Sequence, residues 1–219
     1  MPIQLDETEV RVLGALMEKE VATPEYYPLS LNALVNACNQ KSNREPVVSY
    51  DEDTVETALA GLRAKGLASR LSGHDMRVPK HAHRLSEVFN LGRRESAVLC
   101  VLMLRGPQTT GEIRGRSERL FSFDDLEAVD ACLTRLMEWE PDPLVTSLPR
   151  QPGFKEVRYA HLLSGAAPAQ PVAPAAPSAA VPRETRDDAI AELRASIDRL
   201  EQEVDDLKRQ FAEFKRQFE

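Results

Sequence analysis

Several features that mark particular classes of protein are scarce in this sequence. Three cysteines occur among 219 residues, far apart and each within a helical apolar pattern, so we expect Cys38, Cys100 and Cys132 to be buried thiols without partners. The longest apolar run, residues 97–104, is too short to cross a bilayer. The first residues lack the basic and apolar regions of a signal peptide. We therefore expect a cytoplasmic protein that does not enter a membrane.

Sequence patterns for catalysis and for cofactors are equally scarce. Residues 111–115 lack the lysine and the spacing of a phosphate-binding loop, and no Ser, Cys or His stands in a recognisable nucleophile setting. His81 and His83, with His74 nearby, have no Cys or carboxylate partner in a motif, and His161 lies far along the chain. We expect surface histidines, no metal, no cofactor and no enzymatic activity.

The overall composition is that of a soluble globular protein. Hydrophobic residues make up 42% of the chain and charged residues 29%. The formal net charge of −7 argues against a strongly basic nucleic-acid binder. Residues 41–84 are different, because they contain eight Lys or Arg and six Asp or Glu.

Residues 30–71 carry the main structural pattern. A short helix at 30–38 leads into the polar turn 39–46, and a longer helix follows with a capping box of Ser49 and Glu52 at its start. Its apolar residues recur at helical spacing: Val55, Ala58, Leu59 and Leu62.

Beyond this helix the pattern predicts strands. Gly66 ends the helix, residues 67–71 alternate like a strand, and residues 76–78 can return as a second strand. Residues 85–90 indicate a short connecting helix. A first helix, at 6–20 and capped by Asp6, precedes these elements. A helix followed by a helix, a turn, a helix and a two-stranded wing is the winged-helix plan.

The same plan recurs further along the chain. Residues 9–17 and 95–103 share five identities in nine positions, and Thr109 with Glu112 forms a second capping box. Residues 144–148 and 155–161 flank a Pro/Gly-rich turn as a second wing. The duplication supports the fold prediction.

These patterns predict a mainly α (α+β) protein in four parts. Two tandem winged-helix domains, residues 1–84 and 85–164, precede an Ala/Pro-rich linker at 165–182 and a coiled-coil helix at 183–219.

The last segment has an apolar heptad pattern with β-branched residues at its first three a positions and Leu at its first three d positions, which favours a parallel homodimer. The alternative is a lone amphipathic helix that folds back on the globular part. The residues predicted to form the dimer are Ile190, Leu193, Ile197, Leu200, Val204, Leu207, Phe211, Phe214 and Phe218.

Charge along the second helix of each unit bears on DNA binding. That helix normally enters the major groove by its N-terminal end, which here carries Asp51–Asp53 in one unit and Asp124–Asp125 in the other. Those carboxylates would repel phosphates. The candidate DNA contacts are instead the polar and basic residues of the first turn, helix end and wing: Lys41, Ser42, Asn43, Arg44, Arg63, Lys65, Arg70, His74, Arg77 and Lys80. A solvated mixed-charge surface is the alternative.

Three stretches carry a resemblance to a known family. Residues 31–47, LNALVNACNQKSNREPV, look like a signature of the YceH family of uncharacterised bacterial proteins, and residues 5–19 and 91–99 are similar to it as well. The resemblance covers residues 3 to about 163 and implies a tandem winged-helix fold, often with a coiled-coil tail, in a cytoplasmic bacterial protein. It implies no particular activity.

Two hypotheses about function follow. In the first, the homodimer binds double-stranded DNA through the turn and wing of its first unit, as a regulator or nucleoid-associated factor. In the second, the tandem units hold a protein partner without DNA. Convergence of Lys41, Arg44, Arg70 and Arg77 would favour DNA, and exposed apolar residues around Tyr26, Tyr27 or Trp139 would favour a protein.

Overall fold

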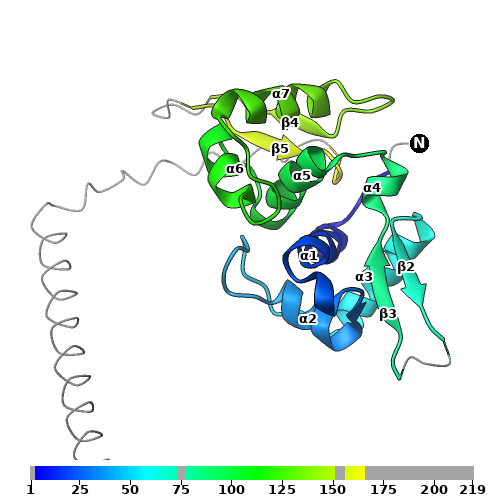
Figure 1. The fold of residues 1–219 in the computed structure, drawn as a ribbon. Helices are drawn as coiled ribbons and strands as arrows, with labels where there is room; N and C mark the ends of the chain where they lie inside the picture. Colours follow the sequence, from blue (N-terminus) through cyan, green and yellow to red (C-terminus); the bar gives the residue numbers. More distant parts are fainter. Residues whose placement is uncertain (1–2, 74–76, 151–155, 166–219) are drawn as a thin grey trace, which may run out of the picture. The chain divides into compact units, whose positions relative to one another are not determined.

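A computed structural model describes residues 3–73, 77–150 and 156–165. In these ranges the chain forms a mixed α+β structure of seven α-helices and two small antiparallel sheets (Figure 1). The elements are α1 (Glu7–Ala22), the 3₁₀ turn η1 (Pro24–Tyr26), β1 (Leu29–Ser30), α2 (Leu31–Cys38), α3 (Glu52–Ala64), β2 (Ala68–Leu71), β3 (Lys80–His83), α4 (Leu85–Val88), α5 (Arg93–Arg105), α6 (Thr110–Ser117), α7 (Leu126–Met137), β4 (Val145–Ser147) and β5 (Tyr159–His161).

The first half, residues 3–84, packs α1, α2 and α3 together beside a three-stranded sheet of order β1-β3-β2. The apolar stripe of α3 is buried as expected, and Gly66 follows the helix at a φ of +74°, a conformation that glycine adopts without steric cost. In the sheet, β3 pairs antiparallel with β1 on one side and with β2 on the other.

The second half, residues 85–165, repeats this order. The short helix α4 leads into α5, α6 and α7, and then β4 pairs with β5 from Val145↔His161 to Ser147↔Tyr159. This pairing and the short connecting helix agree with the sequence prediction.

Side-chain caps begin most of the long helices. Asp6 with Glu9 and Thr109 with Glu112 form the two capping boxes expected from the sequence. Ser49 does not cap α3, so that prediction was wrong. Asp51 takes this role and accepts a hydrogen bond from the Thr54 N–H at 2.8 Å, because the helix begins only at Glu52.

Helices α1 and α5 join the two halves. Figure 1 shows α1 between α5 on one side and α2 on the other. A Cβ atom at Gly14 would lie 3.0 Å from Leu104 Cδ2 and 3.3 Å from Met103 Cβ, so the absence of a side chain there allows the helices to approach closely. One apolar core runs through both halves, and all described residues belong to one compact unit, Met1–Pro168.

The sheet corrects two further predictions. The returning strand is β3 at Lys80–His83 and does not lie at residues 76–78, of which 77 and 78 form a bend. His81 and His83 are buried, not on the surface, because β3 is the central strand and their side chains face inward.

Several predictions fall outside the described ranges. They concern His74, most of the 165–182 linker, and the coiled coil at 183–219 with its nine dimer residues. None of the helices in the described part of the chain combines the length and apolar content needed to cross a bilayer.

Candidate functional site

The turn at residues 39–46 is built around Arg44, whose side chain has no solvent exposure. Its guanidinium makes a two-pronged ion pair with Glu18 of α1, with nitrogen–oxygen distances of 3.1 and 2.6 Å. It also donates to the carbonyls of Ala37, at 3.1 and 3.0 Å, and of Asn43, at 2.9 Å. Arg44 therefore connects α1, α2 and the turn.

Further hydrogen bonds close the two ends of this turn. Arg11 donates to the carbonyl of Cys38 at 3.3 Å and to that of Pro46 at 2.6 Å. The side-chain amide of Asn39 exchanges two hydrogen bonds of 2.8 Å with the backbone of Tyr50. Several of the polar residues in this turn are therefore explained by hydrogen bonds that hold the turn in place.

The structure therefore corrects the assignment of Arg44 as a DNA contact. A guanidinium that is fully buried and already paired with a carboxylate cannot reach a phosphate. Arg63 and Lys65 are also paired, with Glu56 at 3.0 Å and with the buried carboxylate of Glu9 respectively.

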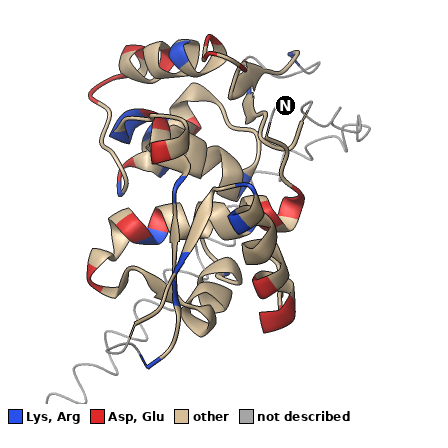
Figure 2. Cartoon of the chain, turned by 90° about the vertical axis from the view of Figure 1, so that its right-hand side faces the viewer, with Lys and Arg blue, Asp and Glu red and all other residues tan. Residues whose placement is uncertain are grey.

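The remaining described candidates do not come together. Lys41, Ser42 and Asn43 are exposed on the turn, whereas Arg70 lies on β2, the half-buried Lys80 on β3, and Arg77 in the bend before β3. Figure 1 shows the turn and the strands β2 and β3 on opposite sides of the first half. Figure 2 views the side of these strands, where both blue and red ribbon segments occur.

The starts of α3 and α7 are acidic and exposed. Asp51 and Asp125 cap the two helices, and each accepts a hydrogen bond from a backbone N–H group. The neighbouring acids are exposed as well: Glu52, Asp53, Asp124 and Glu127. Negative charge is favourable at the N-terminus of a helix, and its cost is a surface that repels phosphates.

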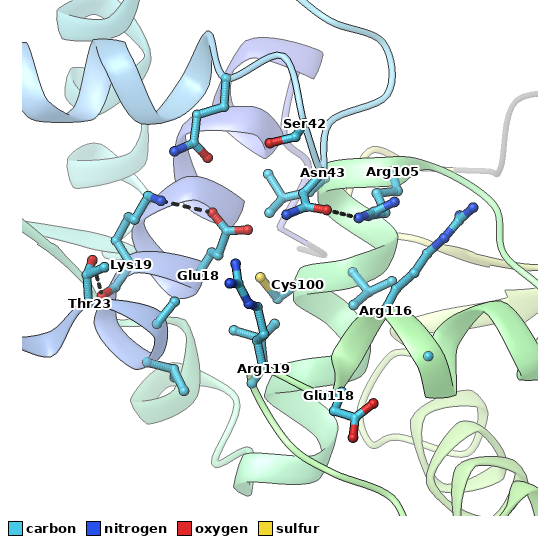
Figure 3. Close-up of a pocket in the computed structure, with 17 residues that line it drawn as sticks. Glu18, Lys19, Thr23, Ser42, Asn43, Cys100, Arg105, Arg116, Glu118 and Arg119 are labelled. Carbon is cyan, nitrogen blue, oxygen red and sulfur yellow. Dashed lines mark hydrogen bonds and ion pairs between the residues drawn. The ribbon is translucent and has the colours of Figure 1, made fainter. Parts of the chain in front are cut away.

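A pocket of about 690 Å³ lies where the two halves meet. It is lined by the end of α1, the 39–46 turn, α5, and α6 with the residues after it. The apolar part of its wall comes from the buried face of α5, at Cys100, Val101 and Leu104, and from Val21, Ala22 and Leu120. Polar groups of the turn, including Ser42 and Asn43, complete it (Figure 3).

Cationic side chains from both halves line this pocket. They are Lys19, Arg105, Arg116 and Arg119, against the carboxylates of Glu18 and Glu118. Figure 3 shows Arg119 extending toward Glu18 and Cys100, while the carboxylate of Glu118 points away from them. Burial, followed by the charge of Arg116, lowers the pKa of Arg105, which donates a hydrogen bond to Asn43.

Sequence reasoning missed this pocket. Arg105, Arg116 and Arg119 are near one another in the chain, but Lys19 of α1 is more than 80 residues away, and the packing of α1 against α5 brings it to them. The available signal was the run from Arg114 to Arg119, where three arginines occur in six residues around a short helix.

Burial shifts the pKa values of the thiols and of His161. All three cysteines are buried and free, as expected, and burial raises the pKa of Cys38 and of Cys132 to about 12. Burial lowers the pKa of His161 to about 4. The described ranges contain no group of three or more His, Cys, Asp or Glu placed to hold a metal ion.

Aromatic exposure is uneven. Tyr26 is 69% exposed, whereas Tyr27 is half-buried and its hydroxyl accepts a hydrogen bond from the His83 N–H at 2.8 Å. Trp139 is half-buried, and the guanidinium of Arg135 lies over its ring at 5.4 Å. Of the three aromatic residues named beforehand, only Tyr26 offers a largely exposed ring.

Comparison with known proteins gives a family and close relatives. Residues 5–154 match the model of a family described as "Protein of unknown function, DUF480". A UPF0502 protein of Solibacter usitatus is 69% identical over 165 residues, 75% of this chain and 78% of that protein. A UPF0502 protein of Opitutus terrae is 54% identical over 191 residues, covering 87% and 83%. One of Geobacter metallireducens is 53% identical over 203 residues, covering 93% and 90%.

Proposed function

This chain belongs to the DUF480/UPF0502 family of uncharacterised bacterial proteins, and we propose that it is a non-enzymatic binding protein whose two winged-helix units hold a protein partner. The order of elements supports the winged-helix assignment. In the first half α1, β1, α2 and α3 precede β2 and β3, and β1 adds a third strand to the sheet. In the second half α5, α6 and α7 precede β4 and β5.

The acidic start of α3 is the observation that carries this proposal. In a winged-helix protein that reads DNA, this end of the second helix of the motif lies in the major groove, next to two phosphate strands. Here it presents Asp51, Glu52 and Asp53, all exposed. Binding to DNA gains its affinity from cations that displace counterions, and carboxylates oppose that gain. The equivalent end of α7 is acidic as well.

The same surface suits a protein partner that carries Lys or Arg. The exposed side of α3 continues from Asp53 through Thr57 to Ala60, so acids and small residues form a shallow face that a basic helix or loop can approach. Electrostatic complementarity of this kind speeds association and selects the partner.

A charge reversal on α3 tests the argument directly. Duplex DNA of random sequence is titrated with three proteins: the wild type, Glu52→Lys/Asp53→Lys, and Lys41→Ala as the matched variant on the turn. Each titration is repeated at salt concentrations between about 50 and 200 mM. Fluorescence anisotropy should detect no binding by the wild type or by Lys41→Ala. The reversed variant should bind, with an affinity that falls as salt rises.

Two outcomes of this titration would contradict the proposal. Steep salt-dependent binding by the wild type, made shallower by Lys41→Ala, would support the DNA hypothesis through the turn. Failure of the reversed variant to bind would mean that the acids are not what excludes DNA.

Crosslinking in cells tests the partner itself. A photoreactive residue at Ala60 of α3 should give a protein adduct that resists nuclease and disappears with Glu52→Lys/Asp53→Lys. The control places the same residue at the exposed position 87, where no such adduct is expected. Equal adducts at both positions, or a nuclease-sensitive adduct at Ala60, would argue against an interface on α3.

The proposal includes the setting suggested by the sequence, a cytoplasmic protein that is a parallel homodimer through residues 183–219. The heptad pattern supports it. Two copies joined by a tail would present four winged-helix units, and such multivalency raises the overall affinity for a partner with repeated sites.

A further inference from the structure

We propose that the pocket between the two halves binds a small phosphate-bearing molecule of about nucleotide size. This inference concerns a different surface from the α3 face and does not depend on a protein partner. It rests on the convergence of four cationic side chains, a polar turn and an apolar wall around one cavity.

The charges in and behind this pocket favour an anion. Glu18, one of the two lining carboxylates, is held by Arg44 from behind, so its negative charge is compensated within the wall. Glu118 points away from the cavity (Figure 3). Two of the cations already have a carboxylate neighbour, since Arg116 lies 3.4 Å from Glu112 and Lys19 lies 3.6 Å from Glu18. Among the described residues, Arg105 and Arg119 make no ion pair and are the cations most available to an anion.

Arg105 and Arg119 complete the positive side. Arg105 is partly buried beside Asn43, and its pKa is lowered by burial and then by the positive charge of Arg116. Like charges held close together in a partly desolvated site are stabilised when an anion arrives between them. Guanidinium groups suit phosphate in particular, because they donate two parallel hydrogen bonds to its oxygens.

The size and the wall of the pocket indicate more than a bare ion. Sites for small organic ligands have volumes of roughly 300–1,000 Å³, mostly with apolar walls and a few polar groups. Here the 690 Å³ pocket has apolar lining from α1, α5 and the segment after α6, including the exposed Val21, together with the polar residues Ser42 and Asn43 of the turn. Such a wall can pack against a ring while the turn donates hydrogen bonds to it. Cys100 contributes only packing, because burial raises the pKa of its thiol.

The ligand would contact both halves at once. Lys19 and the turn belong to the first half, and Arg105, Arg116 and Arg119 belong to the second. Binding would therefore stabilise the junction of α1 and α5, and the unfolding temperature should rise with ligand concentration.

Calorimetry with the full chain tests the site, using ATP, pyrophosphate, inorganic phosphate and adenosine as probes. ATP should bind more tightly than either inorganic anion, and adenosine should not bind. Lys19→Ala/Arg119→Ala should weaken ATP binding at least tenfold, because two charge-assisted contacts are lost. Arg70→Ala/Arg77→Ala, the matched control on the wing, should leave it unchanged.

The outcomes are distinct. No binding of any phosphate probe by the wild type would overturn the proposal, and binding unaffected by Lys19→Ala/Arg119→Ala would overturn the location. Equal affinity for phosphate and ATP would overturn the role of the apolar wall. If random duplex DNA displaces ATP, the pocket reads a nucleic-acid backbone and the small-molecule assignment fails. The circular dichroism spectrum of each variant establishes that it is folded.

Discussion

Replacement of Arg44 by alanine is the sharpest test of how the 39–46 turn is held. The substitution removes the ion pair with Glu18 and all three hydrogen-bonding contacts to the carbonyls of Ala37 and Asn43. Glu18 is only 14% exposed and keeps Lys19, at 3.6 Å, as its remaining cation. The buried carbonyl of Ala37 loses both of its donors from Arg44.

The expected cost is about 3 kcal/mol in the free energy of unfolding. Removal of one partner from a buried ion pair typically costs about 3–5 kcal/mol, because the other charge stays buried without compensation. The proximity of Lys19 places the value at the lower end. A loss of this size is a large part of the roughly 5–15 kcal/mol by which most domains are stable.

The loss should depend on pH, and its sign follows from Glu18. Burial raises the pKa of this carboxyl, but the hydrogen bond and charge of Arg44 outweigh burial and hold the pKa below its usual 4.5. A carboxyl with a lowered pKa contributes stability above its unfolded pKa and loses it as pH falls through the folded pKa. In Arg44→Ala the pKa rises, so the difference between variant and wild type should be largest near pH 7 and shrink below about pH 4.5.

Urea unfolding followed by circular dichroism at pH 7 and pH 4 measures this difference. Lys41→Ala is the matched control, since Lys41 is exposed on the same turn and surface substitutions usually change stability by less than about 0.5 kcal/mol. A loss below about 1 kcal/mol for Arg44→Ala, equal at both pH values, would refute the view that this pair holds the turn. Because Arg44→Ala is expected to destabilise the fold, a loss of DNA binding in this variant would not identify a DNA contact. Lys41→Ala is expected to keep the fold stable and can be used for that purpose.

Three further predictions concern other parts of the chain. Gly14→Ala should lower the free energy of unfolding by about 1 kcal/mol in urea titrations, because crowding against Leu104 and Met103 outweighs the better helix propensity of alanine; a gain in stability would mean that α1 and α5 separate easily. Asp125→Ala should cost about 1 kcal/mol in the same assay through loss of the cap to Ala128 N–H, and no loss would show that α7 does not need this cap. Leu200→Asp should convert the dimer proposed here into a monomer by light scattering, and an unchanged mass would contradict the heptad interpretation.

Local sequence signals predicted most of the elements correctly. The capping pairs Asp6/Glu9 and Thr109/Glu112 act within one helical turn, and the apolar stripe of α3 follows from helical spacing alone. The misplacement of β3 has a local cause as well. Residues 80–83 read KHAH, and the two inward-facing positions are histidines. A buried strand is usually recognised by apolar residues at every second position, so the sequence pattern did not reveal the inward face of β3.

Contacts between distant parts of the chain decided the rest. Arg44 looked like a surface cation because no sequence pattern reveals Glu18, which lies 26 residues away and pairs with it in the interior. The pocket is a stronger case, since Lys19 of α1 joins Arg105, Arg116 and Arg119 only because α1 packs against α5, with a close approach at Gly14. Helix formation and capping depend on neighbours within a few residues, and the sequence determines them directly. Charge pairing and cavity shape depend on which helices pack together, so only the tertiary structure decided whether each cation faces solvent, a carboxylate or a binding site.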